Sequence, residues 1–60
     1  MNTHDQILEL VKVYSTENER FESKGVKASA ARARKALSEM SKLVKVRRSE
    51  IQEAKMNLGK

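Results

Sequence analysis

The glycine and proline content allows one strong interruption inside this chain. The 60 residues contain no proline, and their two glycines are Gly25 and Gly59. The remainder is dominated by alanine, leucine, lysine, glutamate, arginine and methionine, which favour helices. Because helices commonly end at a glycine in the left-handed conformation, Gly25 predicts a boundary between two helical segments. We therefore predict an all-α single domain over 1–60, with helices at about 4–23 and 27–57 and a turn at about 24–26.

The ends of the first helix carry recognisable signals. Thr3 and Gln6 have the spacing of a capping box, and Asp5 is an acid in the first turn, where it favours the helix dipole. Lys24 directly precedes Gly25, as expected of a last turn followed by a left-handed cap. These signals predict a start near residue 4 and a tight turn around Gly25.

Apolar residues recur at alternating intervals of three and four in both segments, which places them on one face of each helix. In the first helix the predicted stripe is Ile7, Val11, Tyr14, Asn18 and Phe21. In the second helix the predicted stripe, heptad-like in its spacing, is Ala30, Ala33, Leu37, Met40, Val44, Arg47, Ile51, Ala54 and Leu58. A short turn makes the helices antiparallel neighbours, so these stripes predict a two-helix hairpin.

A chain of this size is expected to need a partner. A 60-residue domain buries only about 60% of its unfolded surface, and cysteine, which could form stabilising disulfides, is absent. The second helix is the longer one, so its last apolar residues project past the first helix. We predict a homodimer in which two hairpins form a four-helix arrangement. The predicted second seam draws on Leu43, Val46, Leu8, Leu10 or Val13.

Charge divides the chain into two unequal parts. Residues 1–23 hold two bases and five acids, a net charge of −3, whereas residues 24–60 hold eleven bases and three acids, a net charge of +8. The whole chain therefore carries +5, which favours a polyanionic partner. Solubilising faces usually mix the two signs, so the excess in the second part predicts a binding surface.

The bases of the second helix fall largely on one side. At 100° per residue, Arg34, Lys35, Lys42 and Lys45 share an arc that Arg32 and Arg48 flank. Bases spaced along a rigid rod can contact successive phosphates of a nucleic acid. The predicted DNA contacts are Lys27, Arg32, Arg34, Lys35, Lys42, Lys45 and Arg48. Arg47 interrupts the apolar stripe, and we predict that it pairs with Asp5 in preference to joining the phosphate-binding face.

The sequence lacks the residue patterns that several classes of function require. The sequence has no paired carboxylates, activated nucleophile, glycine-rich phosphate loop or metal-ligand cluster, so we expect no enzyme, catalytic residue, cofactor, metal or small-molecule substrate. No apolar run approaches a transmembrane length, and we expect a soluble cytoplasmic chain that binds no membrane. Tyr14 and Phe21 belong to the apolar stripe, which argues against base stacking and favours backbone contacts to double-stranded DNA.

The basic segment also resembles a known family. Gly25-Val26-Lys27-Ala28-Ser29-Ala30-Ala31-Arg32-Ala33-Arg34-Lys35-Ala36-Leu37, followed by Lys42, Arg47-Arg48 and Glu50-Ile51-Gln52-Glu53-Ala54-Lys55, resembles the small bacterial linker-histone-like nucleoid proteins. The resemblance covers about residues 18–56. It departs from the family pattern at Val26, where asparagine is usual, and at Ala30-Ala31, where Gly-Thr is usual. It implies non-specific DNA binding and compaction in the nucleoid.

Two functions from different classes therefore remain open at this stage. The first is a histone-like protein that contacts the DNA backbone through the second helix and compacts or bridges duplexes. The alternative is a coiled-coil interaction module whose basic face binds an acidic protein, and the heptad-like stripe is its main support.

Overall fold

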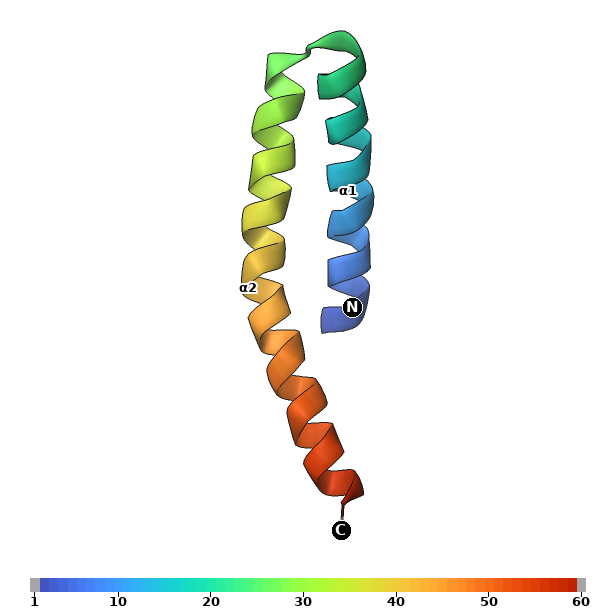
Figure 1. Ribbon diagram of the computed structural model, residues 1–60, viewed down its shortest axis with the longest axis vertical. Helices are drawn as coiled ribbons and strands as arrows, with labels where there is room; N and C mark the ends of the chain where they lie inside the picture. Colours follow the sequence, from blue (N-terminus) through green and yellow to red (C-terminus); the bar gives the residue numbers. More distant parts are fainter. Residues whose placement is uncertain (1, 60) are drawn as a thin grey trace.

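The computed structural model describes residues 2–59 and shows a helical hairpin (Figure 1). Helix α1 spans Thr3–Lys24 and helix α2 spans Lys27–Leu58. The helices run side by side in opposite directions from the turn, and the molecule measures 53 × 17 × 14 Å. All regular structure within residues 2–59 is helical, which confirms the predicted all-α class; the structure contains one copy of the chain.

The start of α1 differs from the predicted capping box. Asn2 is the N-cap residue, and its side-chain oxygen accepts a hydrogen bond of 2.8 Å from the backbone N–H of Asp5. Thr3 already lies within the helix, and its hydroxyl donates instead to Glu50 of α2. The prediction of Thr3 as the cap was wrong because Asn2 offers an equally good cap one residue earlier, with Asp5 three residues after it.

The turn has the predicted glycine geometry. Gly25 adopts φ 64° and ψ 30°, in the left-handed region, and its N–H donates to the Phe21 carbonyl at 2.8 Å. Lys24 is the basic residue of the last turn of α1, as expected. Val26 is extended and serves as N-cap of α2, where its carbonyl accepts from the N–H groups of Ser29 and Ala30. Two residues therefore suffice to reverse the chain.

The buried face of α2 is rotated relative to the predicted stripe. Ser29, Ala33 and Ala36 are buried, whereas the predicted stripe members Leu37 and Val44 are exposed. Small side chains allow two helices to approach closely, so the hairpin packs through its serine and alanines near the turn. The face then continues through the half-buried residues Met40, Leu43 and Arg47.

The buried face of α1 is shifted in a similar way. Leu10 and Tyr14 are half-buried and Glu17 is buried, while the predicted members Val11 and Phe21 are exposed. We call the set Leu10, Tyr14, Glu17, Ser29, Ala33, Ala36, Met40 and Leu43 the seam. Because Leu10 and Leu43 belong to it, they are not available for the second seam that the sequence analysis assigned to them.

The end of α2 extends beyond α1. Glu50 lies level with Thr3, to which it is hydrogen-bonded, so residues 51–58 project past the start of α1 (Figure 1). Eight residues correspond to about 12 Å of helix. Every residue of this overhang is exposed. Neither helix is sufficiently long and apolar to cross a membrane, within the part of the chain that the structure describes.

Candidate nucleic-acid interface

Five of the seven predicted DNA contacts lie on the solvent-facing side of α2, with Lys35 at its edge, where it lines a shallow groove with Leu10 and Val13 of α1. Each is separated by two residues from a seam residue of α2, a rotation of about 200° around the helix axis. Thus Lys35 follows Ala33, and Lys42 follows Met40. Lys27, Arg34 and Lys45 stand in the same relation to Ser29, Ala36 and Leu43, and all five are exposed. We call Lys27, Arg34, Lys35, Lys42 and Lys45 the basic face.

The basic face forms a ladder of positive charge along α2. Lys27 and Lys45 are 18 residues apart, which corresponds to about 27 Å along a continuous helix. The N-terminal end of α2 has no acid in its first turn, so its helix dipole adds to the positive potential near Lys27. Arg48 is also exposed and lies beside this face, one residue after Arg47. A rigid ladder of this kind can contact phosphates without rearrangement of the backbone.

Arg32 differs from the other predicted contacts because an acid of α1 holds it. Its Nη1 donates to Glu17 Oε2 at 3.2 Å, across the two helices. The second carboxylate oxygen, Oε1, lies 3.7 Å from Nη1 of Arg20, one turn further along α1. Among the described residues, Arg32 is the one predicted contact that makes an ion pair. The other six predicted contacts can therefore bind phosphate without breaking an ion pair within the hairpin.

Glu17 is a buried carboxylate that the sequence analysis did not single out. Only 8% of the residue is exposed, because it lies opposite the small residues of α2. Burial raises the pKa of the carboxyl, but the adjacent Ser29 hydroxyl and the hydrogen bond and charge of Arg32 outweigh it, with a further contribution from Arg20. The net effect is a pKa below the ordinary glutamate value, so Glu17 is ionised at neutral pH.

Ser29 completes this small polar cluster. Its side chain is fully buried, and its Oγ forms no hydrogen bond with another residue within 2–59. The hydroxyl nevertheless lies close enough to Glu17 to favour the ionised carboxylate. The polarity of Ser29 thus serves Glu17 electrostatically, while its small size serves the packing of the helices.

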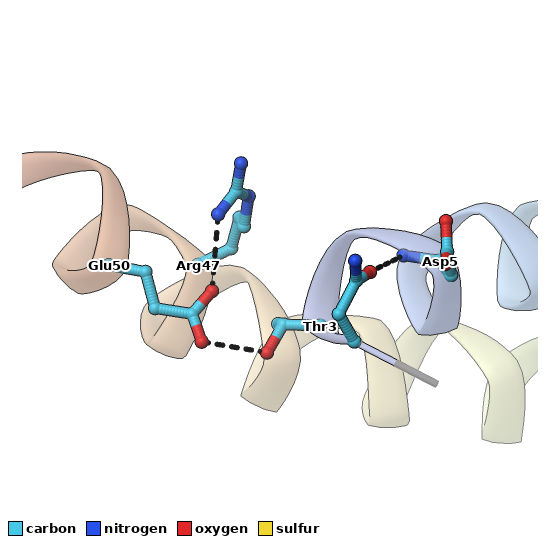
Figure 2. A network of polar contacts seen from close by, with 5 residues as sticks. Thr3, Asp5, Arg47 and Glu50 are labelled. Carbon is cyan, nitrogen blue, oxygen red and sulfur yellow. Dashed lines mark hydrogen bonds and ion pairs between the residues drawn. The ribbon is translucent and has the colours of Figure 1, made fainter. Parts of the chain in front are cut away.

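At the open end of the hairpin, Arg47 contacts a different acid from the one predicted (Figure 2). Its Nη1 donates to Glu50 Oε1 at 3.2 Å, and Glu50 Oε2 accepts from the Thr3 hydroxyl at 2.8 Å. The predicted pair with Asp5 was wrong because Glu50, one turn away on the same helix, competes for the guanidinium. Glu50 therefore links the two helices and neutralises Arg47, which lies beyond the end of the basic face.

The outer face of α1 has the opposite charge. Asp5, Glu9 and Glu19 are exposed, and each is two residues away from Ile7 or Glu17, which point toward α2. The base on this side, Lys12, lies 3.7 Å from Glu9 in an exposed ion pair. The hairpin therefore presents acid on one side and base on the other, and a polyanion can approach through α2 alone.

The two aromatic residues have different environments. Tyr14 is half-buried in the seam, as expected, whereas Phe21 is 43% exposed near the turn. The prediction that Phe21 is covered was wrong, because the small residues of α2 opposite it leave its ring partly open. No cluster of three or more possible metal ligands occurs within residues 2–59.

Comparison with known proteins agrees with the charge distribution. A family model described as "Histone H1-like protein Hc1" matches residues 1–57. The chain belongs to the Hc1 histone H1-like family. The match covers α1 as well as the basic segment, which is more of the chain than the resemblance in the sequence had covered. No curated protein and no solved structure matches the chain.

Membership of the Hc1 family indicates DNA binding and compaction, and it gives no support to the alternative of an acidic protein partner. This is a family of structural DNA-binding proteins and not of enzymes, and it indicates a location in the nucleoid. The seven predicted contact residues all lie in the matched segment. Six are free of ion pairs with other described residues, and Arg32 is bound to Glu17.

Proposed function

We propose that this Hc1-family chain binds double-stranded DNA without sequence specificity, through phosphate contacts made by the basic face of α2 and by Arg48. The observation that carries the proposal is that five exposed bases lie opposite the seam, along about 27 Å of one helix. B-DNA carries one negative charge per about 1.7 Å of its axis, so such a ladder meets many phosphates.

Contacts of this kind give affinity and not sequence readout. Phosphates are the same at every base pair, and specific readout requires side chains that reach base edges in a groove. The basic face consists of lysines and one arginine, interspersed with alanine and serine, without a glutamine or asparagine among its members. We therefore expect similar affinity for duplexes of unrelated sequence.

The acidic outer face of α1 determines which side of the hairpin faces the DNA. Repulsion between Asp5, Glu9 and Glu19 and the phosphates keeps α1 away from the duplex, so each hairpin binds DNA with one side. Arg32 is held at the flank by Glu17, and we assign it a smaller part in binding than the sequence analysis did.

The homodimer predicted from the sequence is part of this proposal. A dimer carries two basic faces, and two faces on one particle can coat a duplex more tightly or bridge two duplexes, which is a route to compaction. We place this activity in the nucleoid, within the cytoplasm.

A pair of matched neutralisations tests the proposal. Lys42→Gln removes a charge from the basic face, and Lys12→Gln removes the same charge from the outer face of α1, where it breaks only an exposed ion pair. In a shift assay with a short duplex at low salt, Lys42→Gln should weaken binding several-fold, and the loss should be the same for unrelated duplex sequences.

Lys12→Gln should bind as tightly as the wild-type chain or slightly less. Equal losses for the two variants would show that net charge alone matters and would refute the assignment of the basic face. Circular dichroism of both variants supplies the control for folding, because both substitutions lie at exposed positions.

A further inference from the structure

One flank of the hairpin carries a line of large apolar side chains that nothing within the hairpin covers. Val11, Leu37, Val44 and Ile51 are 45%, 47%, 44% and 52% exposed. We call these four residues the apolar strip. The three on α2 are spaced by seven residues, the repeat of a left-handed coiled coil. This spacing is the heptad-like pattern that the sequence analysis assigned to the contact between α1 and α2.

The strip lies on one flank because of the antiparallel arrangement. Val11 follows the seam residue Leu10 by one position, and Leu37 follows Ala36 in the same way. In two antiparallel helices that face each other, the residues one position after the seam point to the same flank. Val44 follows Leu43 likewise, so the strip runs along both helices and continues through Ile51 on the overhang.

The opposite flank has a different character. It holds the residues one position before the seam, among them Val13, Arg32 and Glu39, and these line a shallow groove together with Leu10, Lys35 and Ala36. Arg32 is ion-paired there with Glu17. Arg32, Lys35 and Glu39 lie within that groove and are expensive to desolvate. On the flank of the apolar strip, the bases Arg34 and Arg48 lie at the edge of the strip and not among its residues.

The exposed area of the hairpin also exceeds that of a compact monomer. The chain exposes 5028 Å². A compact monomer of 6.8 kDa is expected to expose about 3,950 Å², which leaves an excess of about 1,000 Å². A standard protein interface buries about 800 Å² on each partner, so the excess matches what one interface would cover.

The spacing of the strip fits a second copy of the same chain. A second hairpin packed flank to flank in the opposite direction, related by a two-fold axis, places α1 against α1 and α2 against α2, with its turn against the open end of the first. Because Leu37 and Val44 are seven residues apart on α2, Leu37 of each copy then lies against Val44 of the other, and Ile51 lies near the turn of the second copy. A two-fold interface requires this kind of self-complementarity.

We infer that the apolar strip is the surface through which two copies of this chain associate, antiparallel and flank to flank. The inference rests on the homodimer included in the proposed function, but it does not depend on DNA. It replaces Leu43, Val46, Leu8, Leu10 and Val13 as the residues that form the second seam. The bases opposite the seam remain exposed in such a dimer and are available to DNA.

Sedimentation of two double variants tests this inference. Leu37→Gln/Val44→Gln makes the strip polar, and Val13→Gln/Val46→Gln is the matched change on the opposite flank. Glutamine is a good helix former, so neither pair weakens α1 or α2 through its helix propensity. The wild-type chain and the opposite-flank variant should sediment as dimers at concentrations where the strip variant is a monomer, at least tenfold weaker in self-association.

A second measurement keeps the inference testable if a double variant does not fold. The chain has no cysteine, so Val44→Cys and Val46→Cys each carry a single thiol. Alkylation of Val44→Cys should slow several-fold as the protein concentration rises, and that of Val46→Cys should not. A monomeric wild-type chain, or protection of Val46→Cys instead, would overturn the inference.

DNA binding is measured separately on the same proteins. The strip variant retains every base, so it should still shift a duplex, with weaker apparent affinity because one basic face acts alone. A dimer that does not bind DNA would leave the strip assignment intact and refute the proposed function. A monomer that binds DNA would refute the strip assignment and leave the proposed function intact.

Discussion

The two ends of α2 differ in how much they pack against α1. Near the turn, Ser29, Ala33 and Ala36 are buried against α1, and Glu17 is enclosed with them. At the far end, residues 51–58 are all exposed and no part of α1 lies beside them. The helix is continuous from Lys27 to Leu58 in both environments.

This difference shows where the stability of the hairpin resides. The closely packed half holds most of the basic face, so the positions that contact phosphate are those that α1 makes rigid. The overhang contributes helix without contact to α1, so within the hairpin it depends on its own helix propensity. Substitutions in the two halves should therefore have unequal effects.

The largest effect is expected for a larger side chain in the packed half. Ala36→Leu adds three carbons at a position that is 3% exposed, so it forces the helices apart and should lower the free energy of unfolding by about 1–3 kcal/mol. Ala31→Leu makes the same change at an exposed position and should alter the free energy of unfolding by less than about 0.5 kcal/mol. Urea unfolding followed by circular dichroism, at one protein concentration, measures both, and equal values would show that the seam does not hold the hairpin.

The turn should be the next most sensitive position. Gly25→Ala places a side chain on a residue with φ 64°, and since no atom lies within 4 Å of the added carbon, the cost is the left-handed strain of about 1 kcal/mol. Gly59→Ala is the matched control, because φ there is −76°. Thermal unfolding should show a lower Tm for Gly25→Ala and an unchanged one for Gly59→Ala. An unchanged Tm for both would mean that the turn relaxes at no cost.

A smaller effect, dependent on pH, is expected at Glu17. Its folded-state pKa lies below the ordinary value, so its contribution to stability is present above the unfolded pKa of about 4.3 and is lost as pH falls through the folded pKa. Glu17→Gln should therefore lower Tm at pH 7 and should lose less Tm than the wild-type chain between pH 5 and pH 3. The control is Glu19→Gln on the exposed face of α1, which should follow the wild-type profile. If Glu17→Gln also follows it, the cluster with Arg32 does not contribute to stability.

The smallest effect is expected on the overhang. Met56 is 63% exposed and lies beyond the start of α1, so Met56→Gln should change the free energy of unfolding by less than about 0.5 kcal/mol. The value is obtained from the same urea titration as for Ala36→Leu. A loss comparable with that of Ala36→Leu would contradict the contrast between the two halves of α2.

Much of this fold could be predicted from local patterns. Gly25, the absence of proline and the helix-forming composition were sufficient for two helices and a left-handed turn. The choice of buried face was harder, because alanine and serine can pack between helices as well as lie in solvent. Leucine and valine were therefore placed inside by their hydrophobicity, and the structure buries Ser29 and Ala36 in preference to Leu37 and Val44.

Polar partners across the two helices were the least predictable feature. Glu17 reads as one of several acids on α1, and its burial depends on the small residues that lie opposite it, which a pattern within one helix does not reveal. The available signal was the position of Glu17 on the buried side of α1, opposite Ser29 and Arg32 of α2. That position would have indicated a polar contact between the two helices. Arg47 was predicted to pair with Asp5 of α1, but its partner Glu50 lies on its own helix.

The salt dependence of DNA binding by the wild-type chain tests the central claim most directly. With six bases of α2 engaged, the logarithm of affinity for a duplex should fall against the logarithm of salt concentration with a slope of about −5, measured by fluorescence anisotropy. The slope should be the same for duplexes of unrelated sequence. Absence of binding at low salt, or a slope near zero, would contradict the account.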